Sequence, residues 1–93
     1  MSNRVKAGEN IFEVLGFDNE ESENLKIRAA LMLEVSKYIQ EHSMKQVEAA
    51  KFFQVTQPRI SDLISGKIEK FTIDNLVNML GKANKRVTFH VAA

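Results

Sequence analysis

Two side chains with the hydrogen-bonding geometry to recognise base edges stand close together in this 93-residue sequence. Gln57 and Arg59 lie at the start of a short predicted helix at about residues 57–65. The amide of glutamine can form two hydrogen bonds to adenine, and the guanidinium of arginine can form two to guanine. Gln57 and Arg59 are therefore the first candidates for base contacts. Ser61, one turn further along, is a secondary candidate.

Two lysines just after this helix, Lys67 and Lys70, carry positive charge and are candidates for phosphate contacts. An ordinary solvated surface is the alternative for these lysines and for Gln57, Arg59 and Ser61, because such residues are common on any exposed helix face.

Pro58, the only proline in the chain, indicates where the helix begins. Proline costs about 3 kcal/mol inside a helix but little in the first turn. With Thr56 as the N-cap, Pro58 falls in that first turn. Only two residues then separate the cap from the preceding predicted helix, about residues 44–53. Two short helices joined by so tight a turn predict a helix-turn-helix over residues 46–65.

The remaining pattern is also helical. We expect a long helix over about residues 20–41, capped by Asp18, and another over about residues 73–82, capped by Thr72. Ser43, with Gln46 three residues later, is the predicted cap of the first short helix. Gly66 is expected to end the second. The side chains expected to face inward are Ile27, Leu31, Val35, Ile39, Val47, Ala50, Phe53, Ile60, Leu63, Ile64, Ile73, Leu76, Val77 and Leu80.

The C-terminal segment "RVTFHV", residues 86–91, has the alternation of a strand. Val87, Phe89 and Val91 would lie on one side of it. A single strand is not stable alone, and no second strand is evident in the sequence. The simplest partner is the same strand of a second copy, so these three residues are the predicted dimer contacts. Whether the dimer uses this strand, the helix at 73–82 or both is left open.

The composition is that of an ordinary soluble domain, with 44% hydrophobic and 27% charged residues. The sequence shows no membrane-spanning run and no signal peptide. There is no cysteine, which fits a cytoplasmic location and excludes thiolate metal sites. His42 and His90 stand alone, without metal-ligand spacing. We therefore expect no catalytic residues, no metal, no cofactor and no enzymatic activity.

Charge is distributed unevenly along the chain. Residues 9–34 carry a balance of −5, whereas residues 35–93 carry +4 and residues 1–8 carry +2. We expect residues 1–8 to form a flexible basic arm and residues 9–93 a single domain. The acidic part could contact a basic partner, although a solvated helix start is the simpler interpretation.

The stretch "MKQVEAAKFFQVTQPRISDLISGK" resembles the helix-turn-helix of the XRE/Cro-type repressor family. Together with "ENIFEVLGF" before it and "FTIDNLVNMLGKANKRVTFHV" after it, the chain is similar to the antitoxin-like (HigA-type) branch over residues 9–91. The resemblance implies that Gln46, Thr56 and the N-terminus of the helix at about 44–53 contact phosphates. Gln54 occupies a turn position where the family often has glycine. If this position requires a positive φ, glutamine introduces strain.

The expected fold is all-α: a lambda-repressor-like domain of four to five helices with a short C-terminal β-strand paired across a dimer. The resemblance implies a sequence-specific transcriptional regulator, an autoregulating dimeric repressor on a palindromic operator in double-stranded DNA. It further implies the antitoxin of a type II toxin-antitoxin pair, with a basic ribonuclease toxin as partner. The alternatives are a stand-alone XRE-type regulator and a protein-interaction module that uses the fold only as a scaffold.

Overall fold

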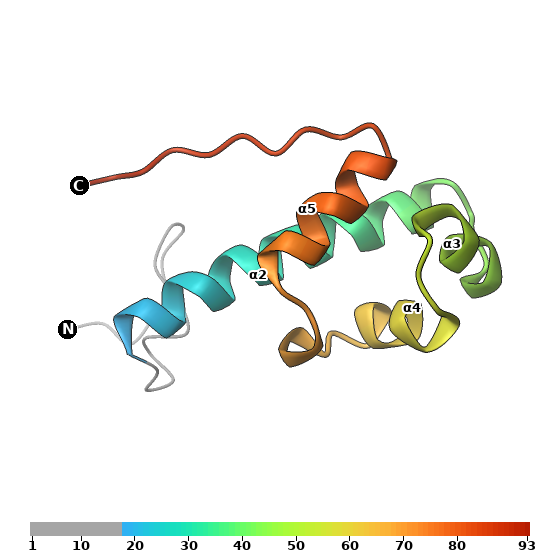
Figure 1. Ribbon diagram of the computed structural model, residues 1–93, viewed down its shortest axis with the longest axis horizontal. Helices are drawn as coiled ribbons and strands as arrows, with labels where there is room; N and C mark the ends of the chain where they lie inside the picture. Colours follow the sequence, from blue (N-terminus) through green and yellow to red (C-terminus); the bar gives the residue numbers. More distant parts are fainter. Residues whose placement is uncertain (1–17) are drawn as a thin grey trace.

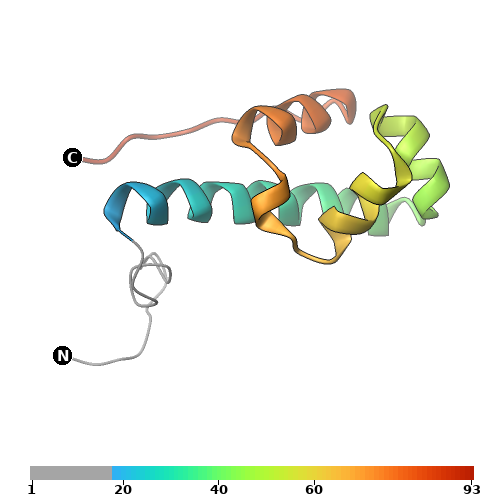
Figure 2. The same cartoon turned by 60° about the horizontal axis from the view of Figure 1, so that its bottom comes forward.

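The computed structural model describes residues 18–93; the expected arm at 1–8 and the rest of the segment up to residue 17 lie outside the described residues. The described part is all-helical, as expected. Its elements are α2 (Asn19–Glu41), α3 (Gln46–Phe53), α4 (Gln57–Ile64), the 3₁₀ turn η1 (Ile68–Lys70) and α5 (Ile73–Lys82). Figure 1 shows α2 along the long axis, with α5 packed beside it and α3 at its C-terminal end. In the turned view of Figure 2, α5 lies above α2, and η1 crosses α2 before the chain enters α5.

The long helix α2 begins as the sequence predicts. Asp18 Oδ1 accepts a hydrogen bond of 2.7 Å from the Glu21 N–H, and Glu20 and Glu21 place negative charge in the first turn, where the helix dipole favours it. No helix in residues 18–93 combines the length and the apolar character needed to cross a membrane.

One hydrophobic core joins the four helices of residues 18–93. Its fully buried large side chains come from every helix and from the loop before α5, and they are Val35, Phe53, Ile60, Leu63, Phe71 and Leu76. Four inward predictions are wrong, because Ile27, Val47, Ile64 and Val77 are exposed. Ile27 and Val77 border an open apolar groove beside the C-terminal tail.

The cap of α3 differs from the predicted one. Ser43 has a φ of 49°, and its N–H donates to the carbonyl of Gln40, so Ser43 belongs to the turn that closes α2. The helix therefore starts at Gln46, with Lys45 at the N-cap and the Glu48 carboxylate accepting from the Lys45 N–H at 2.8 Å. Val47 then lies away from the face that Ala49, Ala50 and Phe53 bury.

The start of α5 confirms the predicted cap. Thr72 Oγ1 accepts from the Asn75 N–H at 3.1 Å, and Asn75 Oδ1 accepts from the Thr72 N–H at 3.2 Å. This reciprocal pair satisfies two N–H groups at the helix start. The helix ends at Lys82, also as predicted.

The predicted strand over residues 86–91 does not form within this single chain; residues 18–93 contain no strand. The segment leaves α5 and runs back along the molecule as an unpaired tail (Figure 1). Val87 packs partly against the core, but Phe89 and Val91 are 88% and 82% exposed. A strand needs a partner for its backbone groups, so the predicted pairing across a dimer stays a prediction.

Candidate nucleic-acid interface

The turn between α3 and α4 is held in one conformation by backbone bonds and side-chain packing. Gln54 ends α3 in the left-handed region, at φ 58° and ψ 46°, the positive-φ conformation in which a residue other than glycine is strained. The Val55 N–H then donates to the carbonyl of Ala50 at 2.9 Å, and the Val55 side chain packs against the core. This arrangement is the common left-handed closure of a helix. It fixes the direction in which α4 leaves α3.

Helix α4 begins with Pro58 as its second residue, where the missing N–H costs little. The N–H groups of Arg59 and Ile60 both donate to the carbonyl of Thr56, which closes the first turn. Thr56 occupies the N-cap position as predicted, but its hydroxyl makes no capping hydrogen bond. The predicted position of the cap is therefore right, whereas its side-chain bond is absent.

The polar candidates at the helix starts are accessible. Gln46 is the first residue of α3, Gln57 is the first residue of α4, and both are exposed, as is Thr56. Ser61 is half-buried and lies four residues after Gln57, so these two side chains share one face of α4. No polar partner within residues 18–93 engages the Gln57 amide. This face of α4 is free to contact a ligand.

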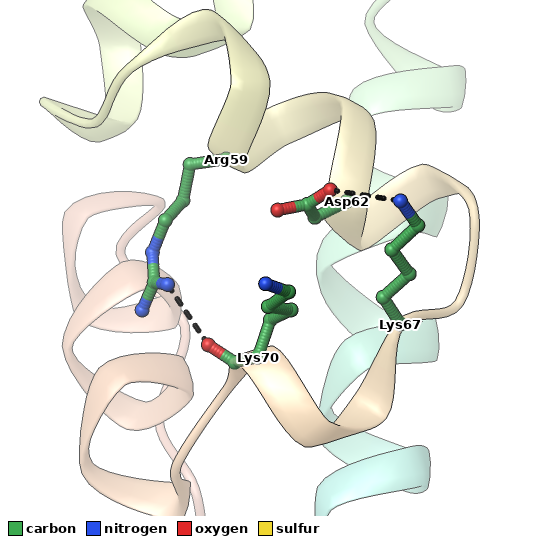
Figure 3. Close-up of polar contacts among 4 residues, drawn as sticks. All are labelled: Arg59, Asp62, Lys67 and Lys70. Atoms are coloured by element: carbon green, nitrogen blue, oxygen red, sulfur yellow. Dashed lines mark hydrogen bonds and ion pairs between the residues drawn. The ribbon is translucent and has the colours of Figure 1, made fainter.

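The guanidinium of Arg59, a candidate for base contacts, is bound to the loop before α5 and to α5 itself. Its Nη1 donates to the carbonyl of Lys70 and its Nη2 to Asn75 Oδ1, both at 2.8 Å. The guanidinium carbon lies 4.6 Å from the centroid of the Phe71 ring, within reach of a cation–π interaction. Figure 3 shows the side chain extending from α4 to the loop below it. The base-reading role of Arg59 stays a prediction, and it would require both bonds to be released.

Lys67 and Lys70 follow α4 in the chain, and both are exposed. Lys67 Nζ lies 3.6 Å from Asp62 Oδ1, an ion pair at the surface, where such pairs contribute little and exchange readily. In Figure 3 the Lys70 side chain points back toward α4. With Arg59, the two lysines place three cations against the two carboxylates of Asp62 and Glu69. The local charge therefore favours an anionic partner.

Comparison with known families decides the class of this arrangement. A family model described as "Helix-turn-helix domain" matches residues 13–92. The chain belongs to the helix-turn-helix domain family. The matched range contains the motif predicted at residues 46–65, where the structure has α3, a turn and α4. A helix-turn-helix places its second helix in the major groove of DNA, so this helix-turn-helix protein is, in coarse terms, a DNA-binding regulator. No curated protein matches the sequence.

The residues that sequence reasoning missed are those that support the site. Asn75 and Phe71 bind the Arg59 guanidinium, and Arg28 on α2 donates to the same loop. One local feature of the sequence indicates a structural role for Asn75, namely its place three residues after the Thr72 cap. No local pattern indicates the role of Arg28, because the two carbonyls that it binds lie 40 and 43 residues away in the sequence. Among residues 18–93, no three histidine, aspartate or glutamate side chains gather as metal ligands.

Proposed function

We propose that this helix-turn-helix protein is a sequence-specific transcriptional regulator that reads the major groove with the N-terminal part of α4. The observation that carries the proposal is the placement of Gln57, an exposed and unengaged amide on the first residue of α4. A recognition helix contacts base edges with this part of its length. Ser61, on the same face, is the second reader.

The surrounding polar groups fit contacts to the phosphate backbone. Gln46 and Thr56 lie at the N-terminal ends of the two helices, where free N–H groups and the helix dipole favour an anion. Lys67 and Lys70 add positive charge next to α4. Such contacts set the register of the protein on the duplex, whereas Gln57 would supply the sequence preference.

A dimer is the proposed binding species. One helix-turn-helix reads only a few base pairs, whereas a two-fold dimer reads two half-sites roughly 34 Å apart. The tail supports this assembly, because its side chains Phe89 and Val91 are exposed and its backbone from residue 86 onward pairs with nothing in residues 18–93. Pairing of two tails through Val87, Phe89 and Val91 would bury these apolar side chains and give the tail backbone hydrogen-bond partners. Helix α5 stays a second candidate for the interface.

The test begins with selection of duplexes from a random-sequence pool by the full-length protein. The selected duplex is then titrated by fluorescence anisotropy at about physiological salt, beside a scrambled duplex of equal length. We expect a preference of roughly a thousandfold or more for the selected site. The Gln57→Ala variant should lose most of it, whereas Gln40→Ala, an exposed glutamine on α2, should not. A pool that yields no preferred sequence would overturn sequence-specific binding and favour the interaction-module alternative.

Autoregulation and a toxin partner are the finer parts of the proposal. A selected sequence found upstream of the protein's own gene would support autorepression. The antitoxin role rests on the resemblance to the HigA-type branch and on the exposed carboxylates of Glu20 and Glu21 at the start of α2. These carboxylates could form ion pairs with a basic ribonuclease.

The antitoxin role is tested through the neighbouring reading frame. A small, strongly basic frame beside the gene should arrest growth when expressed alone, and co-expression of this protein should restore growth. The variant Glu20→Gln/Glu21→Gln should weaken the purified complex. A lone gene, or a neighbour without toxicity, would leave a stand-alone regulator as the function.

A further inference from the structure

Two arginines from different helices bind the backbone of the same short segment, residues 67–71. This segment contains Lys67 and Lys70 and is named the lysine loop. Arg28 of α2 donates through Nη1 to the carbonyls of Ile68 and Phe71, both at 3.1 Å. Arg59 of α4 donates to the carbonyl of Lys70, which lies between them in the chain, at 2.8 Å. Three carbonyls of the loop therefore accept hydrogen bonds from arginine side chains.

The loop does not satisfy all of these carbonyls with its own backbone. Its 3₁₀ turn supplies bonds from the Lys70 N–H to Lys67 and from the Phe71 N–H to Ile68, and neither of these reaches the carbonyls of Lys70 and Phe71. The bonds from Arg28 to the carbonyls of Ile68 and Phe71 are half-buried, and a carbonyl in such a position needs a donor. Apart from these bonds, the loop is anchored by the Lys67 N–H, which donates to the carbonyl of Asp62 at 2.9 Å, by Phe71, which is 1% exposed, and by the half-buried Ile68.

Each arginine is itself held in place. Asn24 Oδ1 accepts from Arg28 Nε at 2.7 Å. Asn75 Oδ1 accepts from Arg59 Nη2 and also caps the start of α5, while the guanidinium lies over the Phe71 ring. The planar guanidinium of Arg59 has several N–H donors, so it can bind a backbone carbonyl, an amide oxygen and an aromatic ring at once. A lysine ammonium lacks this geometry and is not an equivalent replacement.

We propose that Arg28 and Arg59 are positioning residues that clamp the lysine loop against α2, α4 and α5. The clamp fixes where Lys67 and Lys70 meet the phosphates relative to the base-reading Gln57. Arg59 then acts through the loop and touches no base. The effect on DNA rests on the proposed DNA-binding function, whereas the clamp itself is a property of the free protein.

The DNA test is a double-mutant cycle with Arg59→Lys and Lys70→Ala on the selected duplex and its single-base-pair variants. Arg59→Lys keeps the charge but removes the planar fork of donors. We expect it to weaken binding by about tenfold on all duplexes alike, with an unchanged base preference. Lys70→Ala should cost much less in the Arg59→Lys background than in the wild type. Additive effects, together with loss of preference at one base pair per half-site, would overturn the proposal and make Arg59 a base reader.

The free protein gives a second measurement that needs no DNA. In the wild type, the heteronuclear ¹⁵N NOE of residues 68–71 should match that of α4. Both Arg28→Lys and Arg59→Lys should lower the NOE of this loop and leave α4 ordered; the control Arg86→Lys, an exposed arginine in the tail, should change nothing. Unchanged loop values in both variants would overturn the clamp. Absence of any DNA preference in the wild type would instead overturn the proposed function, while the NMR result would still decide the clamp.

Discussion

The ammonium of Lys82, the last residue of α5, donates a hydrogen bond to Oε1 of Gln54, the left-handed residue that ends α3. This bond ties the helix-turn-helix to α5 at the point where the backbone is strained. A non-glycine residue in the left-handed region costs about 1–2 kcal/mol. Gln54 offsets part of that strain through its bond to Lys82, a compensation that glycine could not make.

Substitutions of Gln54 separate the two effects. Gln54→Ala keeps the strain and removes the Lys82 bond, so we expect the free energy of unfolding to fall by about 0.5–1.5 kcal/mol. Gln54→Gly removes the same bond but also the strain, so it should be more stable than the alanine variant by about 1 kcal/mol. Urea denaturation monitored by circular dichroism measures both. Equal stability of the two variants would contradict a left-handed Gln54.

A matched pair of valines tests which helix faces the core covers. Val35 on α2 is 0% exposed, whereas Val47 on α3 is 43% exposed. Val35→Ala should lower the free energy of unfolding by about 2 kcal/mol, because it removes two buried carbons and leaves a cavity. Val47→Ala should change it by less than about 0.5 kcal/mol. A large loss of stability for Val47→Ala in urea denaturation would mean that another surface covers this residue.

The tail can be tested for its proposed role in the dimer. Removal of residues 86–93 should convert the dimer to a monomer in sedimentation-velocity runs, because it deletes the exposed apolar side chains together with the unpaired backbone. Phe89→Asp should have the same effect, whereas Thr88→Asp, on the alternate side of the tail, should leave a dimer. A dimer that survives the truncation would place the interface on α5 instead.

The salt dependence of DNA binding tests the lysines. Removing one phosphate-binding cation should reduce the slope of log K against log salt by roughly 0.9. Lys67→Ala and Lys70→Ala should each lower the slope by about that amount per half-site, with affinity for all sequences reduced alike. Lys37→Ala, which removes an exposed lysine paired with Glu34 on α2, serves as the control. A slope unchanged by both loop variants would exclude the lysines from phosphate binding.

Local rules of sequence predicted much of the fold. Caps at Asp18 and Thr72, the proline in the first turn of α4 and the left-handed Gly66 all follow from preferences within a few residues. The same rules failed at Ser43, because the closure of α2 and the start of α3 compete for one residue. Periodicity also overstated burial at Val47, the second residue of α3, because the core covers only the side of this helix that carries Ala49, Ala50 and Phe53.

The candidate site was predictable in its location but not in its internal bonds. The position of Gln57 follows from the start of α4, which the sequence determines locally. The partners of Arg59 lie 11 and 16 residues away and depend on how α5 packs, so no spacing rule reveals them. An arginine on a short helix has the same sequence signature whether it reaches solvent or a neighbouring loop. The tail strand likewise depends on a partner outside the chain.

The most direct test of the central claim is a base-pair scan of the selected duplex with wild type and Gln57→Ala. Each base pair is substituted in turn, and affinity is measured by anisotropy at fixed salt. We predict that Gln57→Ala abolishes discrimination of about 1–3 kcal/mol at one A·T pair in each half-site, at positions related by two-fold symmetry, and leaves the other positions unchanged. A uniform loss at all positions, or no loss at any, would contradict base reading by α4.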